Sequence, residues 1–146
     1  MANQSSFRSN TYHLVVEEFD KNNNLHINER LIGNYLKNEM RVNFYAFIKH
    51  DKDVDELGNN ERVHFHIIIG LNTSYSKNTI ICGFANGLSC NKDIISCRRI
   101  KSFCKSVQYL LHRNDKDKYQ YDYLDIWTND VNELNLSLYR NTSSIH

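Results

Sequence analysis

The stretch Val63–Gly70, VHFHIIIG, constrains the fold more than any other part of the chain. Its β-branched and aromatic residues, closed by a glycine, are typical of a strand. Side chains alternate along a strand, which places His64, His66 and Ile68 on one face and Val63, Phe65, Ile67 and Ile69 on the other. The apolar face predicts a core covered by helices. The polar face brings two imidazoles about 7 Å apart, within reach of one metal ion, although two half-buried histidines or a chance pair on a polar face are the commoner explanation when this strand is considered by itself.

Length and composition indicate one soluble globular domain. The chain has 146 residues, of which 40% are hydrophobic and 24% charged, enough for a sizeable core. No apolar run approaches membrane-spanning length, and the first ten residues have no signal-peptide core. The four cysteines form no Cys-x-x-Cys pair, so we expect reduced thiols in a cytoplasmic protein. We predict a polar segment over residues 1–10 and a single domain over 11–146, with a tail from about 140.

The charge of the chain is unevenly distributed. The net charge is +1, but residues 92–118 carry eight Lys or Arg against three Asp, which gives this segment +5 and the remainder −4. A solvated helix face accounts for many such runs, yet a phosphate-binding face needs the same local field. The residues that we expect to contact DNA on this ground are Arg98, Arg99, Lys101 and Lys105, joined by His112 and Arg113 from the same segment.

The order of predicted elements indicates an α+β fold. Strands are predicted over 11–19, 42–49, 63–70, 93–100 and 118–126, and helices over 29–40, 74–85, 102–113 and 131–139. The first six elements follow the ferredoxin-like, RRM-like order β-α-β-β-α-β. We therefore expect an antiparallel sheet with helices on one face and a ligand site on the other. The short polar connection between the second and third strands predicts a hairpin.

A second polar motif, His50-Asp51-Lys52-Asp53, follows the strand predicted over 42–49. In a hairpin this strand lies beside the strand that carries His64 and His66, so His50 and Asp53 are able to reach the same point in space. Imidazoles combined with a carboxylate suit Mn²⁺, Zn²⁺ or Fe²⁺ better than Mg²⁺, which prefers oxygen ligands. A loop rich in charge is often only solvated, but two strands that deliver four such groups together favour a metal site.

A third motif, Tyr109-Leu-Leu-His112, lies in the helix predicted over 102–113. With the HDKD box and the His-hydrophobic-His strand, it makes the chain similar to the HUH endonuclease domain of plasmid-type rolling-circle replication initiators (Rep proteins). The likeness runs from the first strand to about Ile126, with the three motifs in the family's order and at similar spacing.

The resemblance implies a chemistry and a set of residues. His64, His66, His50 and Asp53 match the metal ligands, with Mn²⁺ or Mg²⁺ as cofactor, and Tyr109 matches the nucleophile. The implied reaction nicks single-stranded DNA at a replication origin, presented in a hairpin, and leaves a 5′-phosphotyrosine and a 3′-OH primer. Host replication proteins are implied as further partners, and a membrane is not. Viral relatives carry a Lys three or four residues after the Tyr, where this chain has His112 and Arg113, so the role of these two stays open.

Other interpretations remain at this point. Relaxases and single-strand transposases share the chemistry, and a non-catalytic RRM-like module would use Phe44, Tyr45, Phe47 and Phe65 to stack bases. A zinc hydrolase would use the His/Asp cluster but leaves Tyr109 unexplained. Of the nine tyrosines, Tyr119, Tyr121 and Tyr123 alternate and are predicted on one face of a strand, as packing or stacking residues. Tyr109 instead lies opposite the apolar stripe of its helix.

Overall fold

The computed structural model describes residues 10–143 of the chain. All but the last residue of the polar segment predicted over 1–10 lies outside the described residues, as do the final three residues of the tail predicted from about 140. The last helix continues through Ser143. Within residues 10–143, no helix combines the length and the apolar composition needed to cross a bilayer.

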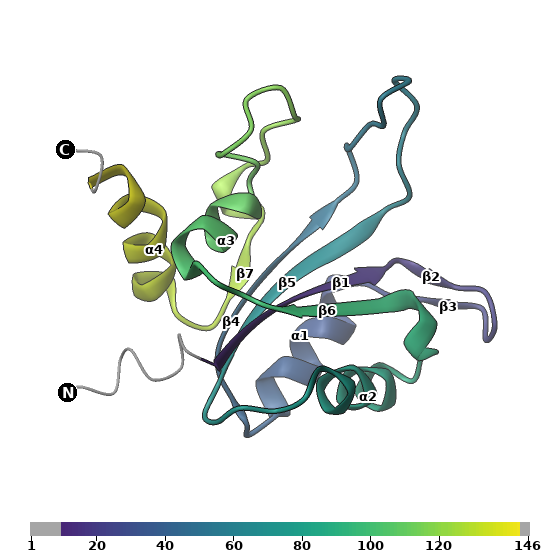
Figure 1. Cartoon of the computed structure of the whole chain (residues 1–146). Helices are drawn as coiled ribbons and strands as arrows, with labels where there is room; N and C mark the ends of the chain where they lie inside the picture. The colour runs from purple at the N-terminus through teal and green to yellow at the C-terminus, as the bar shows by residue number, and fades with distance from the viewer. Residues whose placement is uncertain (1–9, 144–146) are drawn as a thin grey trace.

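The centre of the fold is a five-stranded antiparallel sheet with the strand order β6-β1-β5-β4-β7 (Figure 1). The first four strands of this order have the ferredoxin-like arrangement that the sequence predicts, and the α+β fold class is confirmed. The strands of this sheet are β1 (Thr11–Glu17), β4 (Val42–His50), β5 (His64–Leu71), β6 (Ile95–Arg99) and β7 (Trp127–Thr128). A separate pair is formed by β2 (Phe19–Asp20) and β3 (Leu25–His26).

Four α-helices flank the sheet in residues 10–143, and each of them starts with a side-chain cap. They are α1 (Glu29–Asn38), α2 (Lys77–Leu88), α3 (Phe103–Tyr109) and α4 (Val131–Ser143). Backbone N–H groups in the first turns of α1, α2, α3 and α4 donate to the side chains of Asn28, Ser76, Ser102 and Asp130 respectively, which satisfies donors that a helix start leaves open. Single 3₁₀ turns occur at Lys92–Ile94 and Tyr123–Asp125.

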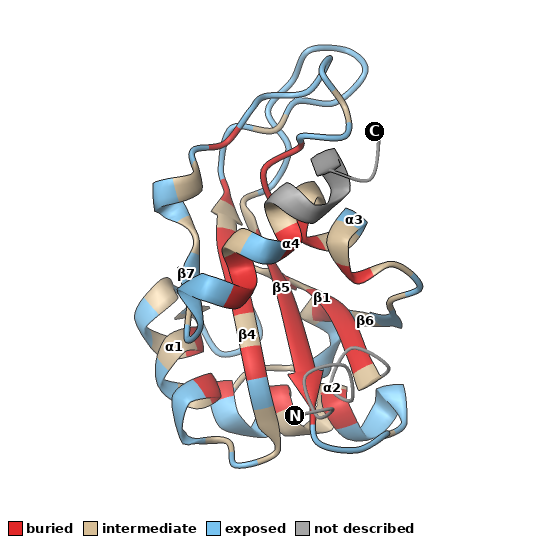
Figure 2. Ribbon diagram, turned by 90° about the vertical axis from the view of Figure 1, so that its left-hand side faces the viewer, coloured by how far each residue is buried: buried red, intermediate tan, exposed pale blue. Residues whose placement is uncertain are grey.

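The first face of the sheet is covered by α1 and α2 (Figures 1 and 2), and a continuous apolar core lies between the sheet and these two helices. Phe65, Ile67 and Ile69 of β5 point into this core, as predicted from the alternation. In α2, a Cβ at Gly87 would overlap the ring of Tyr35 from α1. The glycine therefore allows the two helices to approach closely, at a position where its low helix propensity is otherwise a cost.

The second face of the sheet is covered only at one end, where α3 and α4 pack on it. Ile68 of β5 joins Phe44, Ala46 and Ile48 of β4 in a second core with Phe103, Val107 and Leu110. The polar residues of β5, His64 and His66, lie on this same face beyond the apolar contact. The predicted division of β5 into a core face and a histidine face is thus confirmed.

Two predicted elements differ from the structure. The helix predicted over 102–113 ends at Tyr109 and continues as turns, in which Leu110 N–H donates to Val107 O and His112 has a φ of 62°. The strand predicted over 118–126 is wrong: this segment is irregular and ends in a 3₁₀ turn. Its backbone binds the end of α3 instead of a sheet edge, because Tyr121 N–H donates to Leu111 O.

Candidate metal and nucleophile site

The register of the β4–β5 hairpin brings three histidines together on the second face of the sheet. His50 lies opposite His64, and Ile48 lies opposite His66. Residues directly opposite one another in an antiparallel pair share a face, so the three imidazoles converge. One ligand nitrogen from each lies within 4.8 Å of the others. The convergence that the sequence predicts for these histidines is what the structure has.

Asp53 completes this cluster from the turn that follows β4. Its Oδ2 lies 3.2 Å from His50 Nδ1 and 3.4 Å from His64 Nε2. Its other oxygen, Oδ1, accepts a hydrogen bond of 2.7 Å from the hydroxyl of Tyr121. The first and last residues of the HDKD box therefore contact each other, while Asp51 and Lys52 are exposed and form an ion pair between themselves.

The hydrogen-bond partners of His50 and His64 show which nitrogen of each ring is free. His50 Nε2 lies 2.8 Å from Leu110 O, and His64 Nδ1 lies 2.7 Å from Arg62 O. A carbonyl only accepts, so these two nitrogens carry the protons. In the neutral rings, the lone pairs are then at His50 Nδ1 and His64 Nε2, the two atoms that face Asp53 Oδ2.

Burial keeps the central imidazoles neutral. The pKa of His50 is lowered to about 4, mainly because the ring is removed from water; the hydrogen bond to Leu110 O and the charge of Asp53 offset this only in part. Burial also lowers the pKa of His66, and the neighbouring imidazoles His50 and His13 lower it further. A neutral imidazole nitrogen with an available lone pair is the form that binds metal.

This donor set fits a divalent cation. When both rings are neutral, two lone pairs and a carboxylate oxygen point at one another with no proton between them, an arrangement of acceptors that a positive ion at their centre would satisfy. Three imidazoles and one carboxylate suit Mn²⁺ better than Mg²⁺, because Mg²⁺ prefers oxygen ligands. The residues that would hold the ion are His50, Asp53, His64 and His66.

Tyr109 lies beside this cluster, at the last residue of α3. The centroid of its ring is 5.2 Å from that of His66 and 5.5 Å from that of His112. Lys118 Nζ lies 5.7 Å from the ring centroid. Among the described residues the Tyr109 hydroxyl has no hydrogen-bond partner, and the side chain is partly exposed. The hydroxyl is therefore available to a ligand at the edge of the histidine cluster.

Tyr121 contributes to the site in a way that the sequence did not predict. Its ring stacks on His50 with centroids 4.2 Å apart and an interplanar angle of 1°. Its hydroxyl donates to Asp53 Oδ1 and accepts from Lys52 N–H at 2.9 Å, and burial together with the bond to Asp53 raises its pKa. Tyr121 thus orients two of the candidate ligands. The expectation that Tyr119, Tyr121 and Tyr123 share one face of a strand is wrong, because these residues form no strand.

His13 is a second residue that the sequence analysis missed. It lies on β1, where its Nε2 is 2.8 Å from His66 Nδ1. Its position depends on the pairing of β1 with β5, in which Val15 lies opposite His66. The alternation of TYHLVVE places His13 on one face of its strand, but that pattern does not reveal which strand lies alongside.

The residues predicted to contact DNA have differing environments. Lys101 and Lys105 are exposed. Arg98 and Arg113 are exposed and hydrogen-bonded, to His13 Nδ1 and to Gln120 Oε1 respectively. Arg99 donates to Tyr12 and Ser74. His112 is buried and lies 2.8 Å from Tyr119 O through its Nδ1, so it supports the loop after α3 rather than facing solvent.

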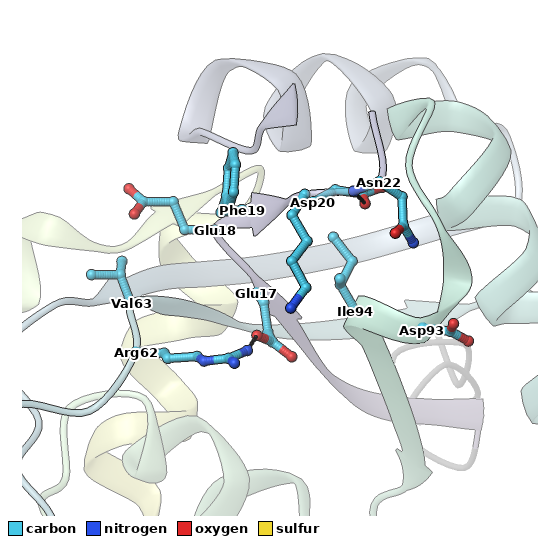
Figure 3. A pocket seen from close by; sticks show the side chains of 10 residues that line it. Glu17, Glu18, Phe19, Asp20, Asn22, Arg62, Val63, Asp93 and Ile94 are labelled. Carbon is cyan, nitrogen blue, oxygen red and sulfur yellow. Dashed lines mark hydrogen bonds and ion pairs between the residues drawn. The ribbon is translucent and has the colours of Figure 1, made fainter. Parts of the chain in front are cut away.

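A large hollow, whose lining includes no histidine, lies beside β1, β2 and the turn at Lys92–Ile94 (Figure 3). Its volume is about 630 Å³, and Glu17, Glu18, Asp20 and Asp93 contribute carboxylates to its lining. Arg62 reaches across to Glu17 in an ion pair of 2.6 Å. Carboxylates repel phosphate, so this hollow is a poorer place for a nucleic-acid backbone than the site around Tyr109.

Comparisons with known proteins identify the family of this chain. Residues 24–135 match the family described as "Plasmid replication protein, origin binding domain". The chain is also 32% identical over 79 residues to the replication protein RepB of Lactiplantibacillus plantarum, a match that covers 54% of this chain and 34% of that protein. The matching part is thus about a third of the length of RepB. Since the family match covers most of the chain, the protein belongs to the origin-binding domain family of plasmid replication proteins.

Proposed function

We propose that this domain binds plasmid origin DNA and nicks one strand by the HUH-type reaction, with Tyr109 as nucleophile. The observation that carries the proposal is the convergence of His50, Asp53, His64 and His66 beside a tyrosine whose hydroxyl has no partner among residues 10–143. The family match favours replication over the relaxase and transposase alternatives, which use the same residue types.

The four ligand residues would hold Mn²⁺ or Mg²⁺, and the bound ion would withdraw charge from the scissile phosphate. The remaining chemistry belongs to the chain. Tyr121 fixes Asp53 and His50, so that the ligands are positioned before DNA arrives. Lys118, whose Nζ lies 5.7 Å from the centroid of the Tyr109 ring, places a positive charge where a phosphate would approach the nucleophile. Lys101 and Lys105 would neutralise phosphates along the strand.

The proposed step balances as a transesterification. The Tyr109 oxygen attacks the phosphorus, a Tyr109 O–P bond forms, and the bond from phosphorus to the 3′ oxygen breaks. The phenol gives its proton to solvent, and the departing 3′ oxygen takes one up. The products are a 5′-phosphotyrosine and a free 3′-OH, which a polymerase is able to extend. Attack of a 3′-OH on the phosphotyrosine reverses the step and rejoins the strand without ATP.

The test is a denaturing gel that separates the covalent protein–DNA adduct. Single-stranded oligonucleotides that carry candidate origin hairpins are incubated with the protein and Mn²⁺. The wild type is expected to form an adduct and Tyr109→Phe to form none, because the substitution removes only the attacking oxygen. Tyr119→Phe is the matched control, since its ring is near the site and its hydroxyl is not the proposed nucleophile.

Two outcomes would contradict the proposal. An adduct with Tyr109→Phe would place the nucleophile elsewhere. An adduct that forms equally well in the presence of a chelator would remove the metal from the reaction. The DNA affinity of Tyr109→Phe, measured by fluorescence anisotropy, should match the wild type, which separates loss of chemistry from loss of binding.

A further inference from the structure

A chain of three side chains connects the surface of β6 to the candidate ligand His66. Arg98 Nη2 lies 3.2 Å from His13 Nδ1, and His13 Nε2 lies 2.8 Å from His66 Nδ1. His13 and His66 are buried, with 3% and 6% of their surfaces exposed. Arg98 is exposed, and β6 is an edge strand whose one partner strand in residues 10–143 is β1. One end of the chain is therefore open to solvent, and the other reaches the metal site.

The donors and acceptors along this chain determine where the protons are. A guanidinium only donates, so His13 Nδ1 accepts from Arg98 and bears no proton. The proton of neutral His13 is then on Nε2, which donates to His66 Nδ1. Neutral His66 in turn carries its own proton on Nε2. While Arg98 contacts His13, the nitrogen of His66 that could face a ligand, Nε2, is therefore protonated.

Metal binding requires the opposite arrangement. His66 Nε2 must offer a lone pair, so Nδ1 must carry the proton and donate to His13 Nε2. His13 must then carry its proton on Nδ1, where it meets the N–H of Arg98, a second donor. The number of protons on the two rings is unchanged: His66 Nε2 releases one to solvent, and His13 Nδ1 takes one up. What has to change is the position of Arg98.

We propose that Arg98 is a positioning residue that couples the binding of DNA phosphate to the binding of the metal ion, an inference that rests on the proposed function. In the free protein Arg98 holds His13 and His66 in the tautomers that oppose ligation. A DNA phosphate is a better partner for a guanidinium than an imidazole nitrogen, because it is charged and accepts two hydrogen bonds at once. When a phosphate takes Arg98 from His13, His66 is released to bind the ion.

Such coupling is reciprocal. If DNA raises the affinity for the metal ion by releasing Arg98, the metal ion raises the affinity for DNA by the same factor. The factor corresponds to one partly exposed hydrogen bond between Arg98 and His13, for which about three- to tenfold is expected. A variant that lacks the guanidinium should behave, with respect to the metal, as though Arg98 had already been released.

The experiment is a calorimetric titration of Mn²⁺ into the folded chain of 146 residues. Arg98→Met removes the donor and keeps the bulk, and it is expected to bind Mn²⁺ about three- to tenfold more tightly than the wild type without DNA. Arg99→Met, which removes the same charge from the neighbouring residue, is the control and should alter the affinity much less. Equal affinities for Arg98→Met and the wild type would overturn the inference.

Two further measurements separate this inference from the proposed function. In the Tyr109→Phe background, a short single-stranded oligothymidylate should enhance Mn²⁺ binding less when Arg98→Met is also present. Nitrogen-15 NMR of labelled histidine should find His13 protonated at Nε2 in the metal-free wild type, and at Nδ1 once Zn²⁺ is added. If the wild type binds no Mn²⁺, the proposed function fails. If it binds Mn²⁺ while the His13 tautomer stays the same, only the coupling fails.

Discussion

The two faces of strand β5 differ in the interactions that hold them, and two adjacent residues illustrate the difference. Phe65 is completely buried in the core beneath α1 and α2, whereas His66 is buried among other imidazoles. The first face is held by apolar contacts that depend on volume. The second is held by hydrogen bonds whose direction depends on which nitrogen carries a proton. We therefore expect substitutions on the first face to affect stability, and those on the second to affect metal binding.

The largest effect on stability is expected from Phe65→Ala. Removing a fully buried phenyl ring leaves a cavity and should lower the free energy of unfolding by about 3–5 kcal/mol. His66→Ala, one residue further on, should abolish Mn²⁺ binding and lower stability by clearly less. Urea unfolding followed by circular dichroism measures the free energy of unfolding of both variants, and calorimetry measures their affinity for Mn²⁺. If His66→Ala destabilises the chain as much as Phe65→Ala, the two faces are not distinct in the way described.

Acid should destabilise the metal-free protein through the buried histidines, whereas the apolar contacts of the other face do not depend on pH. The pKa values of His13 and His50 are lowered to about 4, chiefly by burial, whereas in the unfolded chain they return to about 6.5. Between these values the unfolded state binds more protons, so stability is full above pH 6.5 and falls as the pH drops toward 4. Each of these two groups contributes a loss of about 3 kcal/mol across that interval.

The measurement is the urea concentration at the midpoint of unfolding, determined for the metal-free protein at several pH values between about 7 and 5. His13→Gln removes one of the groups and should flatten the pH dependence. His26→Gln changes an exposed histidine and should leave it unaltered. A midpoint that does not depend on pH in the wild type would show that the buried imidazoles titrate alike in both states.

The smallest effect is expected from Tyr121→Phe. The ring still stacks on His50, but Asp53 loses the hydroxyl that donates to it. Loss of such a supporting hydrogen bond typically weakens metal binding by about tenfold. Tyr123→Phe is the control, since its hydroxyl donates to Asn135 Oδ1 at 2.6 Å, in the α4 packing. Calorimetry with Mn²⁺ decides the matter, and equal affinities would mean that Asp53 is oriented by the backbone alone.

Local patterns predicted the parts of this site that depend on one strand or one hairpin. Alternation in β5 gave the shared face of His64 and His66, and the short connection to β4 brought His50 beside them. His13 depends instead on the register between β1 and β5, two strands separated by 46 residues between Glu17 and His64. No local pattern contains that register.

Tyr121 was missed for a different reason. The alternation of Tyr119, Tyr121 and Tyr123 indicates a strand, but the backbone of this segment finds its hydrogen-bond partners at the end of α3. Tertiary contacts overrode the local preference. The basic segment was likewise seen as one patch of charge, yet Arg98 and Arg99 have different partners because they point to opposite faces of β6.

The short length of α3 has a consequence for how such domains are able to change. Because the helix ends at Tyr109, the carbonyl of the next residue, Leu110, is free of the helix and accepts from His50 Nε2. The proposed nucleophile, Tyr109, and a candidate ligand, His50, are therefore connected through adjacent residues. An inserted or deleted residue near position 110 would displace both Tyr109 and the carbonyl that His50 contacts. Helix α3 therefore cannot be exchanged between domains independently of β4. Grafting this helix onto a related domain would succeed only if the recipient's own His50 equivalent met the same carbonyl.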